Sequence, residues 1–442
     1  MHRPKLHPLA LAIVAGLLQV PAHAALYAVD PGEYTSDHGN FPAWYQDSHG
    51  RTLDLCLSKA VSSRVAGAPG APSYMCTLLP TPGVFDDTQP IAFPGNFPDE
   101  AFWFTADAAI VDAARGIDLS YGSAIEAAFA SGDPVEGDQV SFARVRIRVD
   151  VPTAGTYVIT HPYGVEVFDV PAGGRRAINM TRDIGIGAAG DFSGALKGDV
   201  GPFLRSVNGP YTEAGERFIG DPNLNEAVTG SPFNTNFVRI EGPNGLDLRT
   251  DLFAISGKLS EVARPTPLIP LRSTYSRRTE NGDLLAQQDI FVLAPPPPAT
   301  VTLTSQTPNL ALTEANGTGT WYAQSALSPA LPTTVLINAD NSLAIATSQA
   351  TEAALPLTDL VSITRAEYSL ATGTLSLVAS SSDETDPPAF TAQSADGVPI
   401  GDLIGDGPVK TLNQSITPLP PAQVRVTSTH GGSDIEDVVL VP

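Results

Sequence analysis

Residues 142–151 read FARVRIRVDV, in which charged side chains alternate with β-branched ones. This period of two is typical of a β-strand with one buried and one solvated face. A turn sequence follows at Pro152–Gly155, and Thr156–Thr160 and Val165–Val170 repeat the alternation. Short strands at this spacing, separated by Gly and Pro, predict an antiparallel β-sandwich.

Similar strand patterns occur in the C-terminal part of the chain. Val361–Tyr368 and Thr374–Ala379 alternate on either side of a turn that contains Gly, and they predict a β-hairpin. Val424–Thr429 and Asp437–Val441 are expected to form a closing hairpin with its turn at residues 431–432.

The N-terminal part is more mixed. Trp44–Gln46 and Arg51–Cys56 predict a second hairpin, because the turn between them ends in Gly. Ser123–Ala130 predicts one short helix, since Ser is a suitable N-cap and Ala, Ile and Glu follow it.

Two features suggest how the chain divides into domains. Ala294–Ala299 contains four consecutive prolines, which favour a stiff, extended spacer. The alternating pattern begins near Gly137–Ser141, and the phrase Ala154–Tyr157 resembles the entry to a late strand of Ig-like domains, where a tyrosine packs across a corner. The predicted fold class is mostly β, divided into a signal peptide (1–24), an N-terminal β-rich region with one short helix (25–136), an Ig-like β-sandwich (137–293), a proline linker (294–299) and a C-terminal Ig-like β-sandwich (300–442).

The composition excludes two classes of partner. The 442 residues include 47 acidic and 25 basic side chains, for a formal net charge of −22. Such a surface is repelled by phosphate backbones and anionic lipids, so we expect neither nucleic-acid nor membrane-surface binding. Because 42% of the residues are hydrophobic and 16% are charged, the chain can bury a core and is not expected to be disordered.

Residues 1–24 have the pattern of a secretory signal peptide. Arg3 and Lys5 precede an apolar run at Leu9–Val20, and Ala22–Ala24 provides a small-x-small cleavage site. The apolar run is too short to span a bilayer, and no later segment reaches the roughly 20 apolar residues that spanning requires. The expected location is secreted or periplasmic, with no membrane span.

The chain contains two cysteines, Cys56 and Cys76. In an exported protein such a pair predicts a disulfide. The alternative is a thiol pair for metal or redox chemistry, which usually needs closer spacing or neighbouring His ligands.

Catalytic motifs are absent from the sequence. The His residues that follow the predicted signal peptide (His38, His49, His161 and His430) have no i, i+4 or H-x-H spacing, and they are interpreted as turn residues in solvent. We find no nucleophile elbow, S-x-x-K, H-E-x-x-H or phosphate-binding glycine loop. The chain is therefore expected not to be an enzyme.

Two loops rich in carboxylates are candidates for Ca²⁺, the one cofactor considered. The first contains Asp383, Glu384 and Asp386, and the second contains Asp402 and Asp406. Oxygen ligands clustered in a loop suit this ion. The alternative is that these carboxylates are simply solvated.

Exposed aromatic rings on β-sandwiches can bind sugars. Trp321 and Tyr322 follow Gly317 and Gly319 and are the candidate ligand platform, with packing in a core as the alternative.

Two phrases resemble passages of uncharacterised exported bacterial proteins with Ig-like domains. They are Gly137–Arg148 and Gly155–Gly164, and the resemblance covers residues 25–293. It implies export and a sandwich fold and assigns no active site. The function expected from the sequence is an exported, non-enzymatic binding or surface-associated protein with an extracellular protein or glycan partner. The alternatives are a secreted hydrolase or polysaccharide-active enzyme with a C-terminal accessory binding module, and a structural spacer.

Overall fold

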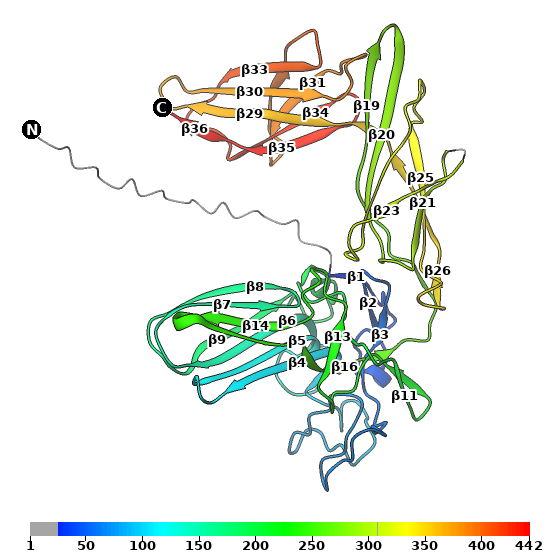
Figure 1. Ribbon diagram of the computed structural model, residues 1–442, viewed down its shortest axis with the longest axis vertical. Coiled ribbons are helices and arrows are strands. Elements are labelled where there is room, and N and C mark those ends of the chain that lie inside the picture. The colour runs from blue at the N-terminus through cyan, green and yellow to red at the C-terminus, as the bar shows by residue number, and fades with distance from the viewer. Residues whose placement is uncertain (1–24, 307) are drawn as a thin grey trace, which may run out of the picture.

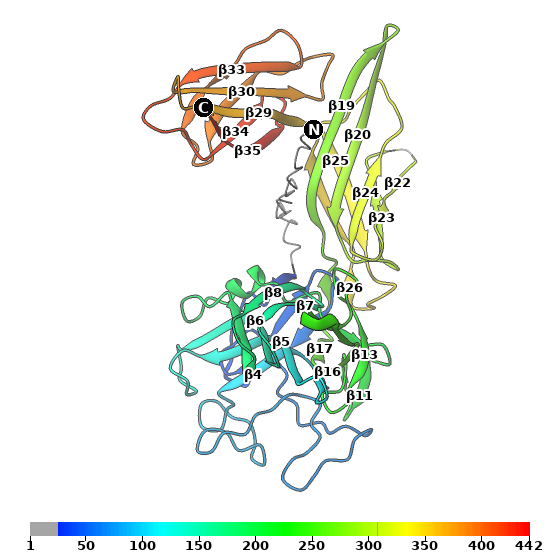
Figure 2. The same ribbon diagram turned by 60° about the vertical axis from the view of Figure 1, so that its left-hand side comes forward.

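The computed structural model describes residues 25–306 and 308–442, which are almost entirely β-structure. They form three successive units, which we call the first unit (25–263), the second module (264–359) and the third module (360–442). Figures 1 and 2 show the second module between the other two. The mostly β fold class expected from the sequence is confirmed. The predicted signal peptide lies outside the described residues.

The first unit contains six longer strands (β4–β9), eleven short strands and three short 3₁₀ helices among the described residues. Its elements are β1 (Leu26–Val29), η1 (Ser36–His38), β2 (Trp44–Asp47), β3 (Thr52–Asp54), β4 (Glu100–Asp112), β5 (Ile117–Phe129), β6 (Gln139–Val151), β7 (Gly155–His161), β8 (Gly164–Val170), β9 (Gly174–Ile184), η2 (Ser193–Lys197), β10 (Arg205–Ser206), β11 (Tyr211–Glu213), β12 (Glu216–Phe218), β13 (Glu226–Thr229), β14 (Val238–Gly242), η3 (Pro243–Gly245), β15 (Leu246–Thr250), β16 (Leu252–Ser256) and β17 (Lys258–Leu259).

Three sheets share one core in this unit. Their strand orders are β10-β13-β16-β4-β5-β6-β9, β15-β14-β7-β8 and β1-β2-β3-β17-β12-β11. One cluster of buried side chains runs from Leu26 to Ile255 and contains the fully buried Trp103. The boundary expected after residue 136 is therefore wrong as a division between cores, because β5 and β6 on either side of it pair along their whole length.

Residues 142–151, with their alternating pattern, lie in β6. Its apolar side chains point into the core and its arginines lie on the other face, as the alternation predicts. Tyr157 of β7 is buried, and its hydroxyl donates a hydrogen bond to the carbonyl oxygen of Thr153 at 2.9 Å. This is the backward contact that a tyrosine corner makes.

The helix predicted at Ser123–Ala130 is wrong. Residues 117–129 form β5, which pairs with β4 on one side and β6 on the other. Ser123, Ala124, Ile125 and Glu126 are all buried, so both faces of the strand are covered. The alternation that marks a half-exposed strand is absent here, and tertiary pairing overrides the helical propensity of the segment.

The second module is a two-sheet sandwich. Its elements are β18 (Arg264–Pro265), β19 (Ile269–Glu280), β20 (Asp283–Leu293), β21 (Thr300–Leu303), β22 (Leu310–Ala311), β23 (Thr313–Glu314), β24 (Thr320–Gln324), β25 (Thr334–Asp340), β26 (Ser348–Gln349), β27 (Thr351–Pro356) and β28 (Thr358–Asp359). The orders of the two sheets are β23-β24-β20-β19-β28 and β22-β21-β25-β27.

The proline tract is not a linker between domains. It connects β20 to β21, which belong to the two facing sheets of the second module and contribute to the same core. The indole Nε1 of Trp321 donates to the carbonyl oxygens of Ala294 and Pro295 at 3.3 and 3.1 Å. The tract therefore crosses from sheet to sheet within one sandwich, and the module boundaries lie near residues 263 and 359.

The third module is a second sandwich. Its strands are β29 (Val361–Ser369), β30 (Thr374–Ser381), β31 (Phe390–Ser394), β32 (Pro399–Leu403), β33 (Val409–Ser415), β34 (Gln423–Ser428), β35 (Ser433–Asp437) and β36 (Val439–Val441). The sheets are β33-β30-β29-β36 and β32-β31-β34-β35.

One of the two hairpins predicted in the third module is confirmed and the other is corrected. β29 and β30 form the expected hairpin. β34 pairs with β35, in which Asp437 lies opposite Gln423, whereas residues 439–441 cross to the other sheet and run parallel to β29 as β36. The pattern in the sequence could not distinguish these partners because both segments are short and follow the same turn.

The disulfide is confirmed. Cys56 and Cys76 are bonded and lie with Met75 and Phe218 in a small cluster beside the main core. Within residues 25–306 and 308–442, no helix has the length and apolar character needed to cross a bilayer.

We expect removal of the disulfide to destabilise the first unit. The bond closes a loop with a sequence separation of 20 residues, and a loop of that length is worth about 3 kcal/mol in the chain-entropy description. Chemical denaturation of the Cys56→Ser/Cys76→Ser variant should therefore give a lower free energy of unfolding than the oxidised parent. A difference of less than about 1 kcal/mol would contradict a stabilising role for the bond.

Candidate functional site

The first unit and the second module meet in a junction held by hydrogen bonds. The amide Nδ2 of Asn341, in the second module, donates to the carbonyl oxygen of His49, in the first unit, at 3.2 Å. The amide Nε2 of Gln46 donates to the carbonyl oxygen of Pro265 at 3.1 Å. These contacts fix the two units against each other.

The turn between β2 and β3 lies at this junction, and its backbone conformation requires a glycine at position 50. Gly50 has a φ of 85°, a conformation that side chains with a Cβ rarely adopt. A Cβ there would also lie 3.0 Å from Nδ2 of Asn341. The predicted hairpin is confirmed, and its Gly ending allows the second module to approach closely.

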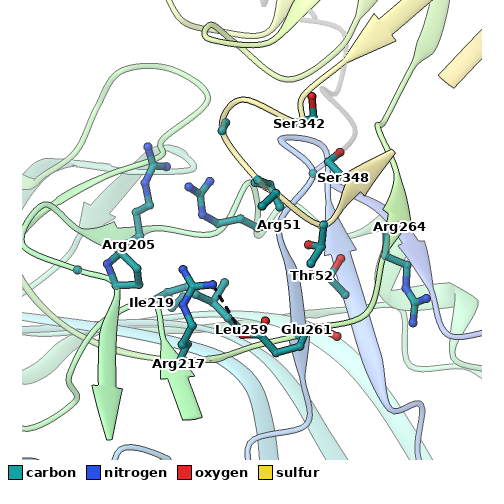
Figure 3. Close-up of a pocket in the computed structure, with 18 of the residues that line it drawn as sticks. Arg51, Thr52, Arg205, Arg217, Ile219, Leu259, Glu261, Arg264, Ser342 and Ser348 are labelled. Carbon is teal, nitrogen blue, oxygen red and sulfur yellow. Dashed lines mark ion pairs between the residues drawn. The ribbon is translucent and has the colours of Figure 1, made fainter. Parts of the chain in front are cut away.

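A cleft of about 490 Å³ opens at this junction (Figure 3). Both units line this junction cleft, whose first-unit residues are Gly50, Arg51, Thr52, Arg205, Gly209, Pro210, Arg217, Ile219, Leu259, Ser260 and Glu261, and whose second-module residues are Arg264 and Ser342–Ser348. The volume falls in the range of small-molecule sites.

Positive charge is concentrated on the first-unit side. Arg51 follows the turn at Gly50, and Arg205 begins β10. Both are partly buried, and among the described residues neither guanidinium has an ion pair or a hydrogen bond. Asp47, fully buried nearby, accepts hydrogen bonds from the backbone N–H groups of Arg51 and Phe203 at 2.8 Å each.

Burial and the two neighbouring arginines shift the pKa values of the titratable groups around Arg51 and Arg205. Burial and the neighbouring Arg51 lower the pKa of Arg205 to about 10, and burial lowers the pKa of Arg51 although Asp47 opposes it. Burial, together with Arg51 and Arg205, also lowers the pKa of His49 to about 3. Burial raises the pKa of Asp47 to about 6, against the pull of Arg51.

The other two arginines of the cleft are already engaged. Arg217 forms an ion pair with Glu261 at 3.7 Å, and the guanidinium of Arg264 lies 4.0 Å from the ring centre of Trp44. Figure 3 shows Arg264 on the far side of the cleft, pointing away from Arg51 and Arg205. Arg51 and Arg205 are thus the pair available to a ligand.

The rest of the cleft has a mixed lining, in which aliphatic side chains stand beside hydroxyl groups such as those of Thr52 and Ser260. Ile219 and Leu259 form part of its floor, and Leu343 and Ile345 come from the loop between β25 and β26. Leu343 is 79% exposed. This combination of two free cations and an apolar wall suits an organic anion.

The candidate sugar platform is corrected by the structure. Trp321 is 5% exposed and belongs to the core of the second module, so it cannot stack on a ligand. Tyr322 is 43% exposed because neighbouring residues of a strand face opposite sides. Its ring is stacked on that of Phe291.

The carboxylates considered for Ca²⁺ lie in two parts of the third module. Asp383 is buried and bound to Arg277, whereas Glu384 and Asp386 are exposed beside it. Asp402 lies on β32 and Asp406 in the turn that follows. In the described part of the chain, no group of three or more His, Cys, Asp or Glu side chains is arranged to hold a metal ion. Calcium binding stays a prediction, which a comparison of melting temperatures with added Ca²⁺ and with chelator tests.

The residues that form the junction cleft were not identified from the sequence. Arg51 and Arg205 lie far apart in the chain, and Asn341, which anchors the opposite wall, is 292 residues from its partner His49. One signal was present, because basic residues are scarce in this chain and Arg51 directly follows the turn of a predicted hairpin. His49 and His161, interpreted as turn residues in solvent, are instead buried.

No protein-family model matches the chain, and no curated protein matches its sequence. Solved structures similar to parts of it include the polymeric Ig receptor ectodomain of a teleost fish, at 6% identity over 39% of this chain and 98% of that chain, with a TM-score of 0.20. A bacterial ice-binding adhesin matches at 10% identity over 69% and 91%, with a TM-score of 0.15. The ectodomain of mouse nectin-like molecule 4 matches at 12% identity over 64% and 90%, also with a TM-score of 0.15. Because these TM-scores are low, the description of the fold rests on the strand pairing of the chain itself.

Proposed function

We propose that the chain is an exported, non-enzymatic binding protein that holds an anionic ligand in the junction cleft. The observation that carries this proposal is the pair Arg51 and Arg205, two partly buried cations that have no anionic side chain as a direct partner among the described residues. Export is supported by the signal-peptide pattern of residues 1–24 and by the disulfide.

The positive charges of Arg51 and Arg205 are not balanced within the cleft. Burying a charge is unfavourable unless it is paired, and two arginines side by side also repel each other. A bound carboxylate, sulfonate or phosphate would supply the missing charge and accept hydrogen bonds from both guanidinium groups. Ligand binding would thus relieve a repulsion that the free protein retains.

A thermal-shift titration tests this function. Residues 25–442 are titrated with sodium methanesulfonate at low ionic strength, with equal concentrations of sodium chloride as the control. A ligand that binds the folded state alone raises the melting temperature by mass action. We expect a saturable rise with methanesulfonate, whereas equal shifts in the two titrations would contradict a specific anion site.

The pH dependence of binding should follow Asp47. Its pKa is raised by burial to about 6, so it is charged at pH 7.5 and neutral at pH 5.0. Protonation removes a negative charge beside Arg51 and Arg205, and a sulfonate, whose own charge is constant, should bind roughly fivefold more tightly at the lower pH. Isothermal titration calorimetry at the two pH values measures this change.

The matched variant for this measurement is Asp47→Asn, after circular dichroism has shown that it is folded. Its sulfonate affinity should be the same at both pH values. Weaker sulfonate binding at pH 5.0 in the parent would contradict the assignment of Asp47 as the titrating group.

A further inference from the structure

We infer that the ligand of the junction cleft is an organic anion with one anionic head, held by Arg51 and Arg205, and an apolar body covered by the loop of residues 341–347. This inference rests on the proposed function and names the chemical class of its ligand. It also assigns a role to the second module, which supplies the loop.

The charges around Arg51 and Arg205 set the charge of the head group. These two cations and the buried Asp47 sum to one net positive charge. Arg217 and Glu261 neutralise each other in an ion pair, and Arg264 is stacked on Trp44. One negative charge on the ligand therefore balances this end of the cleft.

The volume indicates that the ligand extends beyond its head group. A water molecule occupies about 30 Å³ in the liquid, so a cleft of about 490 Å³ is far larger than an inorganic anion requires. The space beyond the arginines is lined by Ile219, Leu259 and residues 342–347 of the loop, with Thr52 and Ser260 contributing hydroxyl groups. Burial of an apolar body there is favourable at about 25 cal/mol per Å².

Hydrogen bonds hold the backbone of the 341–347 loop, and the apolar side chain of Leu343 in this loop is exposed to solvent. The carbonyl oxygen of Asn341 accepts hydrogen bonds from the N–H groups of Ala344 and Ile345, both at 3.0 Å. The backbone N–H of Asn341 donates to the hydroxyl of Thr266 at 3.2 Å, which ties the base of the loop to the junction. Leu343 at the tip is 79% exposed, and Figure 3 shows the loop curving toward Arg51. Leu343 is therefore positioned to cover a ligand whose head lies at the arginines.

Two sulfonates that differ in the length of the apolar body test this inference. Isothermal titration calorimetry compares hexanesulfonate with methanesulfonate, and 1-hexanol serves as the neutral analogue. We expect hexanesulfonate to bind at least about tenfold more tightly than methanesulfonate, because each buried methylene group adds to the affinity. Hexanol should bind much more weakly than hexanesulfonate, since it lacks the anionic head.

Substitution of Leu343 distinguishes its contact with the apolar body of the ligand from the binding of the anionic head by Arg51 and Arg205. Leu343→Ser should lower the affinity for hexanesulfonate by about fivefold and that for methanesulfonate by less. The matched control is Leu370→Ser, an exposed leucine in the third module, which should change neither affinity. Because Leu343 is exposed, the variant is expected to fold normally.

The two proposals fail in different ways. Equal affinities for hexanesulfonate and methanesulfonate, or an unchanged hexanesulfonate affinity in Leu343→Ser, would overturn the ligand class and leave an anion site in place. Absence of binding by both sulfonates would overturn the anion site itself and the inference with it.

Discussion

The double variant Arg51→Gln/Arg205→Gln is expected to bind hexanesulfonate about 100-fold more weakly than the parent, and each single variant about tenfold more weakly. A hydrogen bond to a charged group contributes about 1.5–3 kcal/mol, and glutamine keeps a donor but removes the charge. Isothermal titration calorimetry of the three variants measures these losses. The variants address the two residues that distinguish this cleft from an ordinary surface groove.

A structural role for these arginines predicts the opposite pattern. In that case the single variants would lose stability and keep their affinity for the sulfonate. We expect the reverse, because Arg51 and Arg205 repel each other and each single variant leaves one cation beside Asp47. The control is Arg278→Gln, an exposed arginine in the second module, which should change neither property.

The second large effect is expected at the junction between the second and third modules. Asp383 of the third module is fully buried, and its carboxylate binds the guanidinium of Arg277 and accepts a hydrogen bond from the hydroxyl of Tyr275 at 2.9 Å. Burial alone would raise the pKa of Asp383, but Arg277, the backbone N–H of Asp386 and Tyr275 together hold it below its ordinary value. The carboxylate thus remains charged inside the junction.

Replacing Arg277 by Ala leaves that charge buried without its main partner. Loss of one member of a buried ion pair costs about 3–5 kcal/mol, so the calorimetric transition of the C-terminal modules should fall by about 10 °C or more. The neighbouring Arg278→Ala is the matched control, since its ion pair with Glu280 at 3.3 Å is exposed and such pairs are worth about 0–1 kcal/mol. Equal shifts in the two variants would show that the buried pair does not hold the modules together.

Local patterns in the sequence predicted local structure well. The alternation of residues 142–151, the hairpins at Gly50 and at residues 371–373, and the pair Cys56 and Cys76 all have their expected structures. In the strand and the hairpins, the residues that form the pattern are close together in the chain and form the structure themselves. For the disulfide, two cysteines allow one pairing.

The predictions that failed depended on contacts between distant parts of the chain. The helix expected at Ser123–Ala130 is a strand because β4 and β6 pair with both of its edges. The proline tract is part of a core because the indole of Trp321 binds its carbonyl groups. The same reason explains why the junction cleft was missed, since its walls come from segments nearly 300 residues apart and no local pattern connects them.

A crystal structure of residues 25–442 with para-bromobenzenesulfonate would locate the ligand, because bromine can be identified by its anomalous scattering. We expect one ligand in the junction cleft, with the sulfonate oxygens at Arg51 and Arg205 and the bromine beside Leu343. A sulfonate bound elsewhere, with the cleft occupied by water alone, would contradict the proposed site.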